Sequence, residues 1–214
     1  MNIPAHKHET HQPTKETARL EAFSDGVFAI AITLLVIELI QLVQDKEQED
    51  LLTMLIHHWA SLFAFGFGFV SIFICWINHH VVFDYIIKTN SKLMWVNAFV
   101  LLVVTFTPFA ITVLAKYFNS ERNRAMAFFG FDYLLMSFAA YLLCAYVYKR
   151  SLVDENYRKT FHRLLKLYEY SVYYTFIAFL VCFFSVAVAI TLYCLLFVVF
   201  AFPRASALKL IRGK

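Results

Sequence analysis

The sequence predicts an all-α integral membrane protein with six transmembrane helices, and three features of the chain support this fold class. First, 61% of the 214 residues are hydrophobic and 18% are aromatic, which is well above the apolar share of ordinary soluble domains. Second, the apolar residues are gathered in long runs, and a spanning helix needs roughly twenty of them. Third, the chain has 24 Phe and 12 Tyr but only five Gly and four Pro, which favours helices over the alternating strands of a membrane β-barrel.

Long apolar runs mark the six spans, which we predict at 20–43, 58–83, 93–115, 125–148, 168–184 and 186–203. The last two belong to one run of about 36 residues, which is more than a single tilted helix needs. We therefore predict a tight turn near Phe184 or Ser185 between two antiparallel helices. The spans form one domain, 18–204, between a flexible N-terminal tail at 1–17 and a C-terminal tail at 205–214.

The distribution of Lys and Arg predicts the topology, because cytoplasmic loops collect these residues. If both termini lie inside, fifteen of the 19 Lys and Arg residues fall on inner segments and four fall on outer loops. The segment 45–50 is acidic, and it lies where this topology expects the outside. We therefore expect both termini in the cytoplasm. The inner connection at 149–166 is either a short amphipathic helix on the anionic inner leaflet or a solvated linker.

The first span has two different faces. At 100° per residue, one stripe of mostly large apolar side chains lies within about 40° of a single direction, and it comprises Phe23, Ile30, Leu34, Ile37 and Gln41. Asp25 lies on the opposite face, and Ser24 lies between the two. Spacing alone favours ordinary helix packing for the stripe over the lining of a pore. Thr33 lies at the edge of the stripe, and Glu38 lies near the outer end, where its carboxylate is either interfacial or attracts cations.

Polar residues at the head of the first span need partners, because a buried carboxylate is costly without hydrogen-bond donors. We predict a polar cluster that links the first three spans at their inner ends and comprises Arg19, Ser24, Asp25, Trp76, His79 or His80, and Asn97. Such a cluster is either a structural lock between helices or a proton relay. A metal or haem site is disfavoured, because adjacent histidines on a helix point about 100° apart.

Motifs of soluble enzymes are absent from the chain. It has no phosphate-binding glycine loop, no Gly-x-Ser-x-Gly and no His-Glu-x-x-His. The four cysteines lie in apolar runs without Cys-x-x-Cys spacing, so no disulfide framework is indicated. We therefore expect no enzymatic activity and no cofactor.

Residues over the first three spans form a specific pattern, namely Arg19, Phe23, Ser24, Asp25, Trp76, the His79-His80 pair, Asn97 and Thr107-Pro108-Phe109. This pattern, with Arg-x-x-x-Phe-Ser-Asp at its head, resembles the signature of the lysosomal potassium channel family and its prokaryotic relatives. Six spans with inner termini are similar as well, so the resemblance covers nearly the whole chain.

The resemblance implies a potassium channel in which the first helix of each repeat lines a central pore. A single six-helix repeat implies the prokaryotic arrangement, a homotetramer in the plasma membrane of a prokaryote. The family closes its pore with rings of large aliphatic side chains, which map onto Ile30, Leu34 and Ile37, and Thr33 matches the position of a hydroxyl near the constriction. The expected partners are further copies of the chain, the lipid bilayer and permeating K⁺, with no nucleic acid and no metal beyond transient K⁺ in the pore.

An apolar gate of this kind implies weak selectivity, because it offers few oxygens to replace the hydration shell of an ion. Other monovalent cations are then expected to leak through. The main alternative is a proton channel or proton-coupled transporter that uses Asp25, His79 and His80 as a relay. A membrane haem or quinone enzyme is a third alternative, and the visible spectrum of the purified protein distinguishes it.

Overall fold

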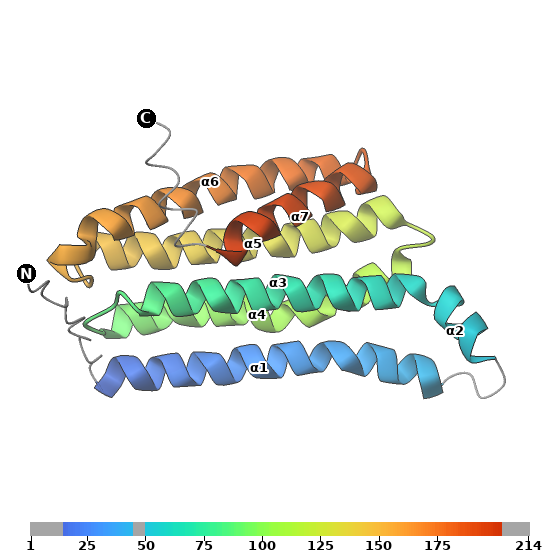
Figure 1. Ribbon diagram of the computed structural model, residues 1–214, viewed down its shortest axis with the longest axis horizontal. Coiled ribbons are helices and arrows are strands. Elements are labelled where there is room, and N and C mark those ends of the chain that lie inside the picture. Colours follow the sequence, from blue (N-terminus) through green and yellow to red (C-terminus); the bar gives the residue numbers. More distant parts are fainter. Residues whose placement is uncertain (1–14, 45–49, 203–214) are drawn as a thin grey trace, which may run out of the picture.

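The computed structural model describes residues 15–44 and 50–202, and its long helices lie side by side in one bundle (Figure 1). The helices are α1 (Lys15–Gln44), α2 (Leu51–His57), α3 (Trp59–Phe83), α4 (Ser91–Tyr117), α5 (Arg122–Lys149), α6 (Arg158–Cys182) and α7 (Val186–Ala201). α4 packs against α3 and α5, α1 packs against α3 and α4, and α6 packs against α5 and α7. The all-α class that the sequence predicts is confirmed for the described ranges.

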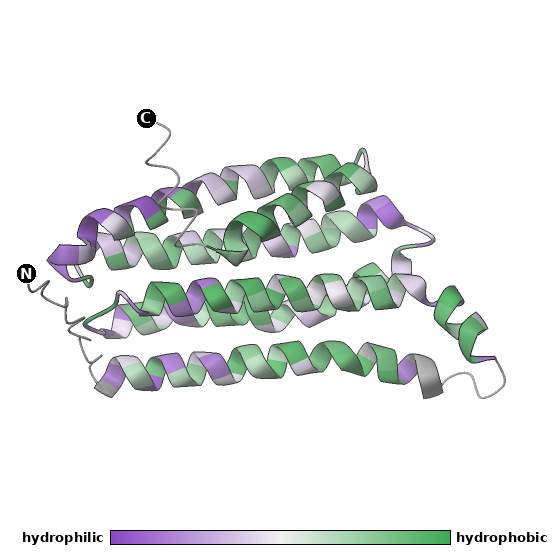
Figure 2. Ribbon diagram, in the orientation of Figure 1, coloured by the Kyte–Doolittle hydropathy of each residue, from purple (hydrophilic) through white to green (hydrophobic). Residues whose placement is uncertain are grey.

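Four of these helices, α1, α3, α4 and α5, are long and apolar enough to cross a membrane. α7 is apolar but has only 16 residues, and α6 carries many polar residues over its first half. Hydrophobic residues cover most of α3, α4 and α7, and hydrophilic residues gather near the ends of the bundle (Figure 2). The chain is a multi-pass membrane protein, while six crossings and the cytoplasmic side of both termini stay predictions.

The first helix begins earlier than the predicted domain boundary. α1 starts at Lys15, so the last residues of the segment predicted as a flexible tail, 1–17, are helical. Thr17 is fully buried, and its hydroxyl lies 2.8 Å from the hydroxyl of Thr89. This contact with the α3–α4 connection extends the ordered helix. The rest of the expected tail and the C-terminal tail at 205–214 lie outside the described residues.

The connection between α5 and α6 is packed against the bundle. The amide of Ile87 donates to the carbonyl of Leu152 at 2.9 Å, and Ile86 and Val153 form an antiparallel bridge. α6 then begins at Arg158, ten residues before the predicted span at 168–184. Its first half is amphipathic, with Phe161 buried. The amphipathic segment is therefore continuous with the helix that follows it and is not a separate helix or a solvated linker.

The bundle ends in a tight turn between α6 and α7. α6 ends at Cys182 and α7 begins at Val186. The hydroxyl of Ser185 accepts a hydrogen bond from the amide of Val188 at 3.4 Å, as an N-cap serine does. The turn therefore lies between Cys182 and Val186, as predicted from the length of the last apolar run.

α1 is the least covered of the four spanning helices. In its most apolar stretch 24% of the residues are buried, against 44% in α3, 56% in α4 and 50% in α5. It lies at the edge of the bundle, with α3 and α4 on one side (Figure 1). Most of the circumference of α1 is therefore free to meet something outside this chain.

Candidate functional site

One face of α1 holds the helix to the bundle. Buried residues recur three or four apart along it, as expected for a single helix face, and they are Thr17, Leu20, Ser24, Phe28, Ala31 and Leu35. This face packs against α3 and α4. Because the contact is a narrow stripe, it fixes the rotation of α1 and leaves the other faces uncovered.

The predicted apolar stripe lies on an uncovered face of α1. Its large side chains are exposed to 64% at Phe23, 59% at Ile30, 41% at Leu34 and 45% at Ile37. Gln41 is exposed as well. The hydroxyl of Thr33, also exposed, donates to the carbonyl of Ile30 at 2.8 Å. The side chain of Glu38 lies outside the described residues.

Ser24 belongs to a buried chain of hydrogen bonds that joins α1, α4 and α3. Its hydroxyl donates to the carbonyl of Leu20 at 2.9 Å and accepts from the side-chain amide of Asn97 at 2.9 Å. The Oδ1 atom of Asn97 lies 2.8 Å from Nε2 of His79. Since Asn97 uses its amide nitrogen toward Ser24, its oxygen accepts, and His79 must carry a hydrogen on Nε2.

The ring of His79 is enclosed by aromatic side chains. It stacks on Phe83 with a centroid distance of 4.4 Å and lies 5.3 Å from Phe28. Only 4% of the residue is exposed, and its Nδ1 atom has no hydrogen-bond partner among the described residues. His79 therefore fills the contact between α1 and α3 and donates one hydrogen bond to Asn97 on α4.

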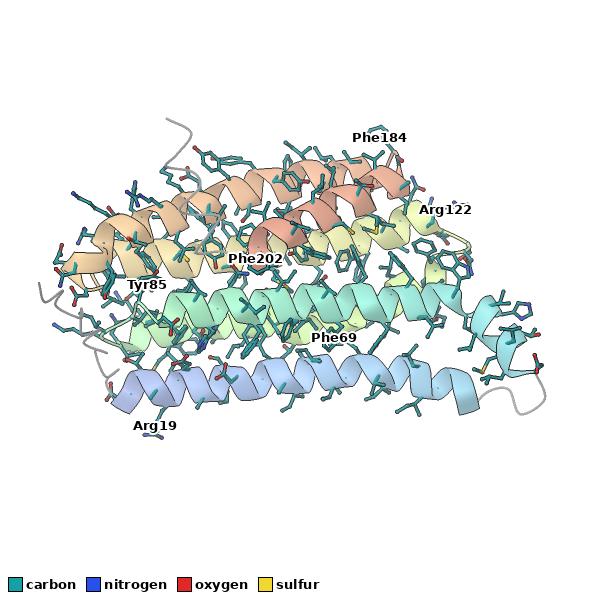
Figure 3. The ribbon with its side chains drawn as sticks, viewed as in Figure 1. Arg19, Phe69, Tyr85, Arg122, Phe184 and Phe202 are labelled. Atoms are coloured by element: carbon teal, nitrogen blue, oxygen red, sulfur yellow. The ribbon has the colours of Figure 1, made fainter. Side chains whose placement is uncertain are left out.

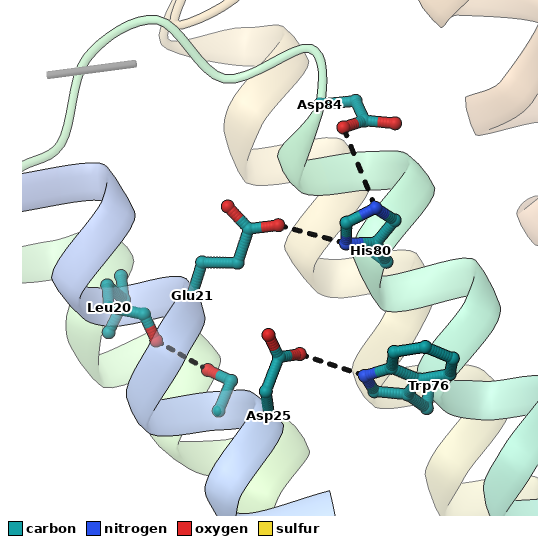
Figure 4. Close-up of polar contacts among 7 residues, drawn as sticks. Leu20, Glu21, Asp25, Trp76, His80 and Asp84 are labelled. Atoms are coloured by element: carbon teal, nitrogen blue, oxygen red, sulfur yellow. Dashed lines mark hydrogen bonds and ion pairs between the residues drawn. The ribbon is translucent and has the colours of Figure 1, made fainter.

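Asp25 belongs to a second, separate set of contacts between α1 and α3 (Figure 4). Its carboxylate accepts a hydrogen bond from Nε1 of Trp76 at 2.8 Å. One turn toward the N-terminal end of α1, Nδ1 of His80 lies 3.0 Å from the carboxylate of Glu21, and Nε2 of His80 lies 4.0 Å from that of Asp84. The predicted single cluster is thus divided, with His79 in the Ser24 set and His80 beside the Asp25 set.

Arg19 joins neither set. It is exposed, and its side chain points away from the other helices (Figure 3). It lines a groove between α1 and the start of α4, together with Phe23 and Asn97. Asn78, the neighbour of His79, turns away from α1 and donates instead to the carbonyl of Phe200 at 2.9 Å.

Asp132 is a buried carboxyl group that the sequence patterns did not single out. It is fully buried in α5, and neither carboxyl oxygen has a hydrogen-bond partner in the described part of the chain. The hydroxyl of Thr107 lies beside it but donates to the carbonyl of Val103 at 3.2 Å. The available signal was a lone acidic residue inside an apolar span, which is unusual in membrane helices.

No group of three or more His, Cys, Asp or Glu side chains is placed to hold a metal ion within residues 15–44 and 50–202. The side chains of the two polar sets are paired with one another across helices. These contacts hold α1 against α3 and α4, and they leave the stripe of Phe23, Ile30, Leu34 and Ile37 uncovered by the described part of the chain.

Comparison with known proteins points to one family. The sequence profile of the family described as "Endosomal/lysosomal potassium channel TMEM175" matches residues 19–108. This range includes Arg19 at its start, both polar sets and Pro108 at its end.

Individual relatives match over a little more than half of the chain. A potassium channel of Chamaesiphon minutus is 45% identical over 114 residues, which is 52% of this chain and 56% of that protein. A potassium channel of Streptomyces collinus is 38% identical over 58% of this chain and 60% of its own length. The endosomal/lysosomal proton channel TMEM175 of Danio rerio is 28% identical over 59% of this chain. The matches thus span less than two thirds of each bacterial relative and 25% of the Danio rerio protein.

A solved structure matches nearly the whole chain. It is the crystal structure of a lysosomal potassium-selective channel TMEM175 homolog from Chamaesiphon minutus, with a TM-score of 0.76 and 30% sequence identity. The match covers 89% of this chain and 99% of that one. The bundle is therefore shared beyond the first three spanning helices that the sequence profile covers.

Proposed function

Because this chain belongs to the TMEM175 family, which consists of ion channels and not of enzymes, we propose that it forms a potassium-permeable cation channel. α1 of each copy lines the pore. Relatives from two bacteria are named potassium channels, and the similar solved structure is described as potassium-selective. These descriptions concern those proteins, and they support the same activity here.

The exposed stripe of α1 is the observation that carries this proposal. Ile30, Leu34 and Ile37 project from a helix that the rest of the chain covers on one side only. A purely apolar stripe could face lipid. However, two exposed polar residues belong to this side of α1, because Gln41 continues the stripe and Thr33 lies at its edge. Polar side chains are unfavourable against acyl chains and are suited to a water-filled path. A ring of four copies of α1 would place the stripe around such a path.

The gate in this arrangement is a set of apolar rings. Ile30 supplies the first ring, and Leu34 and Ile37 supply two more toward the other end of the helix. A narrow ring of aliphatic side chains excludes water and ions until the helices rotate or spread. Since the rings have no oxygens to replace the hydration shell, we expect potassium selectivity to be weak. The Thr33 hydroxyl lies one residue before Leu34 and offers an oxygen near the rings.

The polar contacts behind α1 keep the stripe facing the pore. Asn97 and His79 hold Ser24, and Trp76 holds Asp25. Rotating α1 by one residue position would break both sets together, because they lie on adjacent sides of the helix. In this proposal Ser24 and Asp25 hold α1 in place, and Ile30, Leu34 and Ile37 line the path of the ions.

Substituting one gate residue tests the pore. Ile30→Asn places a polar amide in the narrowest expected ring, so the conductance in planar bilayers should rise and the potassium-to-sodium permeability ratio should change. Val36→Asn is the matched control, because Val36 is also an exposed apolar residue of α1, at 41%, but lies on a different face. Equal conductance and selectivity for Ile30→Asn and the native chain would refute the gate assignment.

The placement in the cell belongs to the same proposal. We place the homotetramer in the plasma membrane of a prokaryote, with six crossings per copy and both termini in the cytoplasm. Impermeant labelling of single cysteines in intact cells tests this topology at Arg124, in the first turn of α5, and at Lys159, in the first turn of α6. Labelling of position 124 from outside and not of position 159 is expected, and the reverse pattern would invert the topology.

Proton conduction is the second candidate function. TMEM175 proteins of Danio rerio and Gallus gallus are named proton channels, and His80 lies between the carboxylates of Glu21 and Asp84 in this chain. A pH gradient across potassium-free vesicles then drives proton flux, and His79→Ala or His80→Gln abolishes it. Potassium currents with no proton flux in such vesicles would exclude this function.

A further inference from the structure

α2 is a short helix at the end of the bundle where α1 stops and α3 begins. Its seven residues, Leu51–His57, are separated from α3 by His58, whose φ of −102° and ψ of 22° interrupt the helix. α2 consequently leaves the bundle and is inclined to α3 (Figure 1). No residue of α2 is buried, so this helix contributes nothing to the core of the chain.

The sides of α2 differ in polarity. At 100° per residue, its apolar side chains cover an arc of about 200°, and they are Leu51, Leu52, Met54, Leu55 and Ile56. Thr53 and His57 occupy the remaining arc. The apolar arc is strongly exposed, with values of 67% at Leu51, 65% at Leu52 and 61% at Ile56. A contiguous apolar surface of this kind does not stay in contact with water.

The position of α2 along the bundle indicates what covers the apolar arc. The membrane-spanning helix α3 begins at Trp59, two residues after α2 ends. Trp59 is 48% exposed and Tyr117, at the end of α4, is 42% exposed, as is typical of aromatic residues at a membrane–water boundary. On its other side α2 follows a segment, 45–50, with four acidic residues, which require water. α2 therefore lies at the level of the boundary.

We propose that α2 is an interfacial membrane anchor whose apolar arc lies among the acyl chains of the adjacent leaflet. Thr53 and His57 face the headgroups and water. An apolar arc opposite a narrow polar one is the form of helices that lie in the plane of the interface. A second copy of the chain is a poorer occupant, because helix packing covers a narrower stripe than 200°. The inference requires only that α3 crosses the membrane, and it holds whichever ion the protein conducts.

Nitroxide accessibility in lipid vesicles tests the anchor. Labels are placed at Ile56→Cys and Thr53→Cys in the full chain with its four cysteines replaced by Ala. Collision rates with oxygen, which concentrates in lipid, and with a water-soluble nickel chelate are then measured. Controls are Val188→Cys on the exposed apolar side of α7 and Arg124→Cys, whose native side chain is 83% exposed.

The expected result is an oxygen-to-nickel collision ratio at position 56 that matches Val188→Cys and a ratio at position 53 that matches Arg124→Cys. Equal access of nickel to positions 56 and 53 would place α2 in water and overturn the proposal. Low access of both reagents to position 56 would show that a second copy covers it, which also overturns the proposal.

A second measurement does not depend on removing the cysteines. Ile56→Trp and Thr53→Trp are introduced into the native chain, and fluorescence is recorded in vesicles of brominated lipid. The tryptophan added at position 56 should be quenched more than the one added at position 53, after subtraction of the native signal. Equal quenching at the two positions contradicts an interfacial helix.

Discussion

Replacing Asn97 by Leu tests whether the Ser24 set of hydrogen bonds holds α1 to the bundle. Asn97 is 1% exposed and uses both ends of its amide, toward Ser24 and toward His79. Leucine has a similar volume and makes neither hydrogen bond. The substitution therefore removes the polar bridge from α1 to α3 while filling the same space.

The expected destabilisation follows from the contacts that are lost. Two hydrogen bonds between membrane helices contribute about 0.6 kcal/mol each. The Nε2 hydrogen of His79 then lacks an acceptor in a buried site, which costs about 1–3 kcal/mol. Ser24 loses less, because its hydroxyl still donates to the carbonyl of Leu20. We expect Asn97→Leu to lower the free energy of unfolding by about 2–4 kcal/mol.

Reversible unfolding in mixed micelles with increasing dodecyl sulfate, followed by circular dichroism, measures this change. Met94→Leu is the control, because Met94 is one turn away on α4 and 48% exposed, and surface substitutions stay within about 0.5 kcal/mol. A double-mutant cycle with Ser24→Ala should give a coupling energy of about 0.6 kcal/mol and no more than about 1.7 kcal/mol. Native stability of Asn97→Leu would refute the assignment of these residues to structural support.

Two further substitutions test the packing of the bundle. Gly68→Ala should lower the free energy of unfolding by about 1–3 kcal/mol, because the new Cβ would lie 2.6 Å from Cγ1 of Ile111. Gly66→Ala, whose new Cβ meets no atom within 4 Å, should be neutral or stabilising. Asp132→Leu should raise the free energy of unfolding by about 1–3 kcal/mol, because a buried polar group without a partner is unfavourable. A loss of stability in Asp132→Leu would show that the carboxyl group binds a partner in the assembled protein.

The sequence patterns identified which residues at the head of α1 are structurally important but not how they pair. Ser24 and Asp25 differ by about 100° on the helix, which is enough to direct Ser24 toward Asn97 on α4 and Asp25 toward Trp76 on α3. His79 and His80 are adjacent near the end of the second predicted span, so their position along the helix did not show which of them contacts Asp25 or Ser24. The structure separates them because only His79 faces the inside of the bundle.

Two features were missed for different reasons. Asp132 stood out neither by motif nor by spacing, since its significance depends on the lack of partners in three dimensions. α2 lies in a stretch that precedes a predicted span, and seven residues are too few for a clear periodic signal. The exposure of α2 and the lack of hydrogen-bond partners at Asp132 are known only from the tertiary structure.

The sequence by itself determined the membrane class, the approximate positions of the long apolar helices and the two faces of α1, because these follow from the local order of apolar and polar residues. Only the tertiary structure decided that α1 is the least covered spanning helix and that its aliphatic stripe is left exposed. The physical reason is that coverage depends on helix rotation and on partners far away in the chain. Asp25 and Trp76 are separated by 51 positions, and Ser24 and Asn97 by 73.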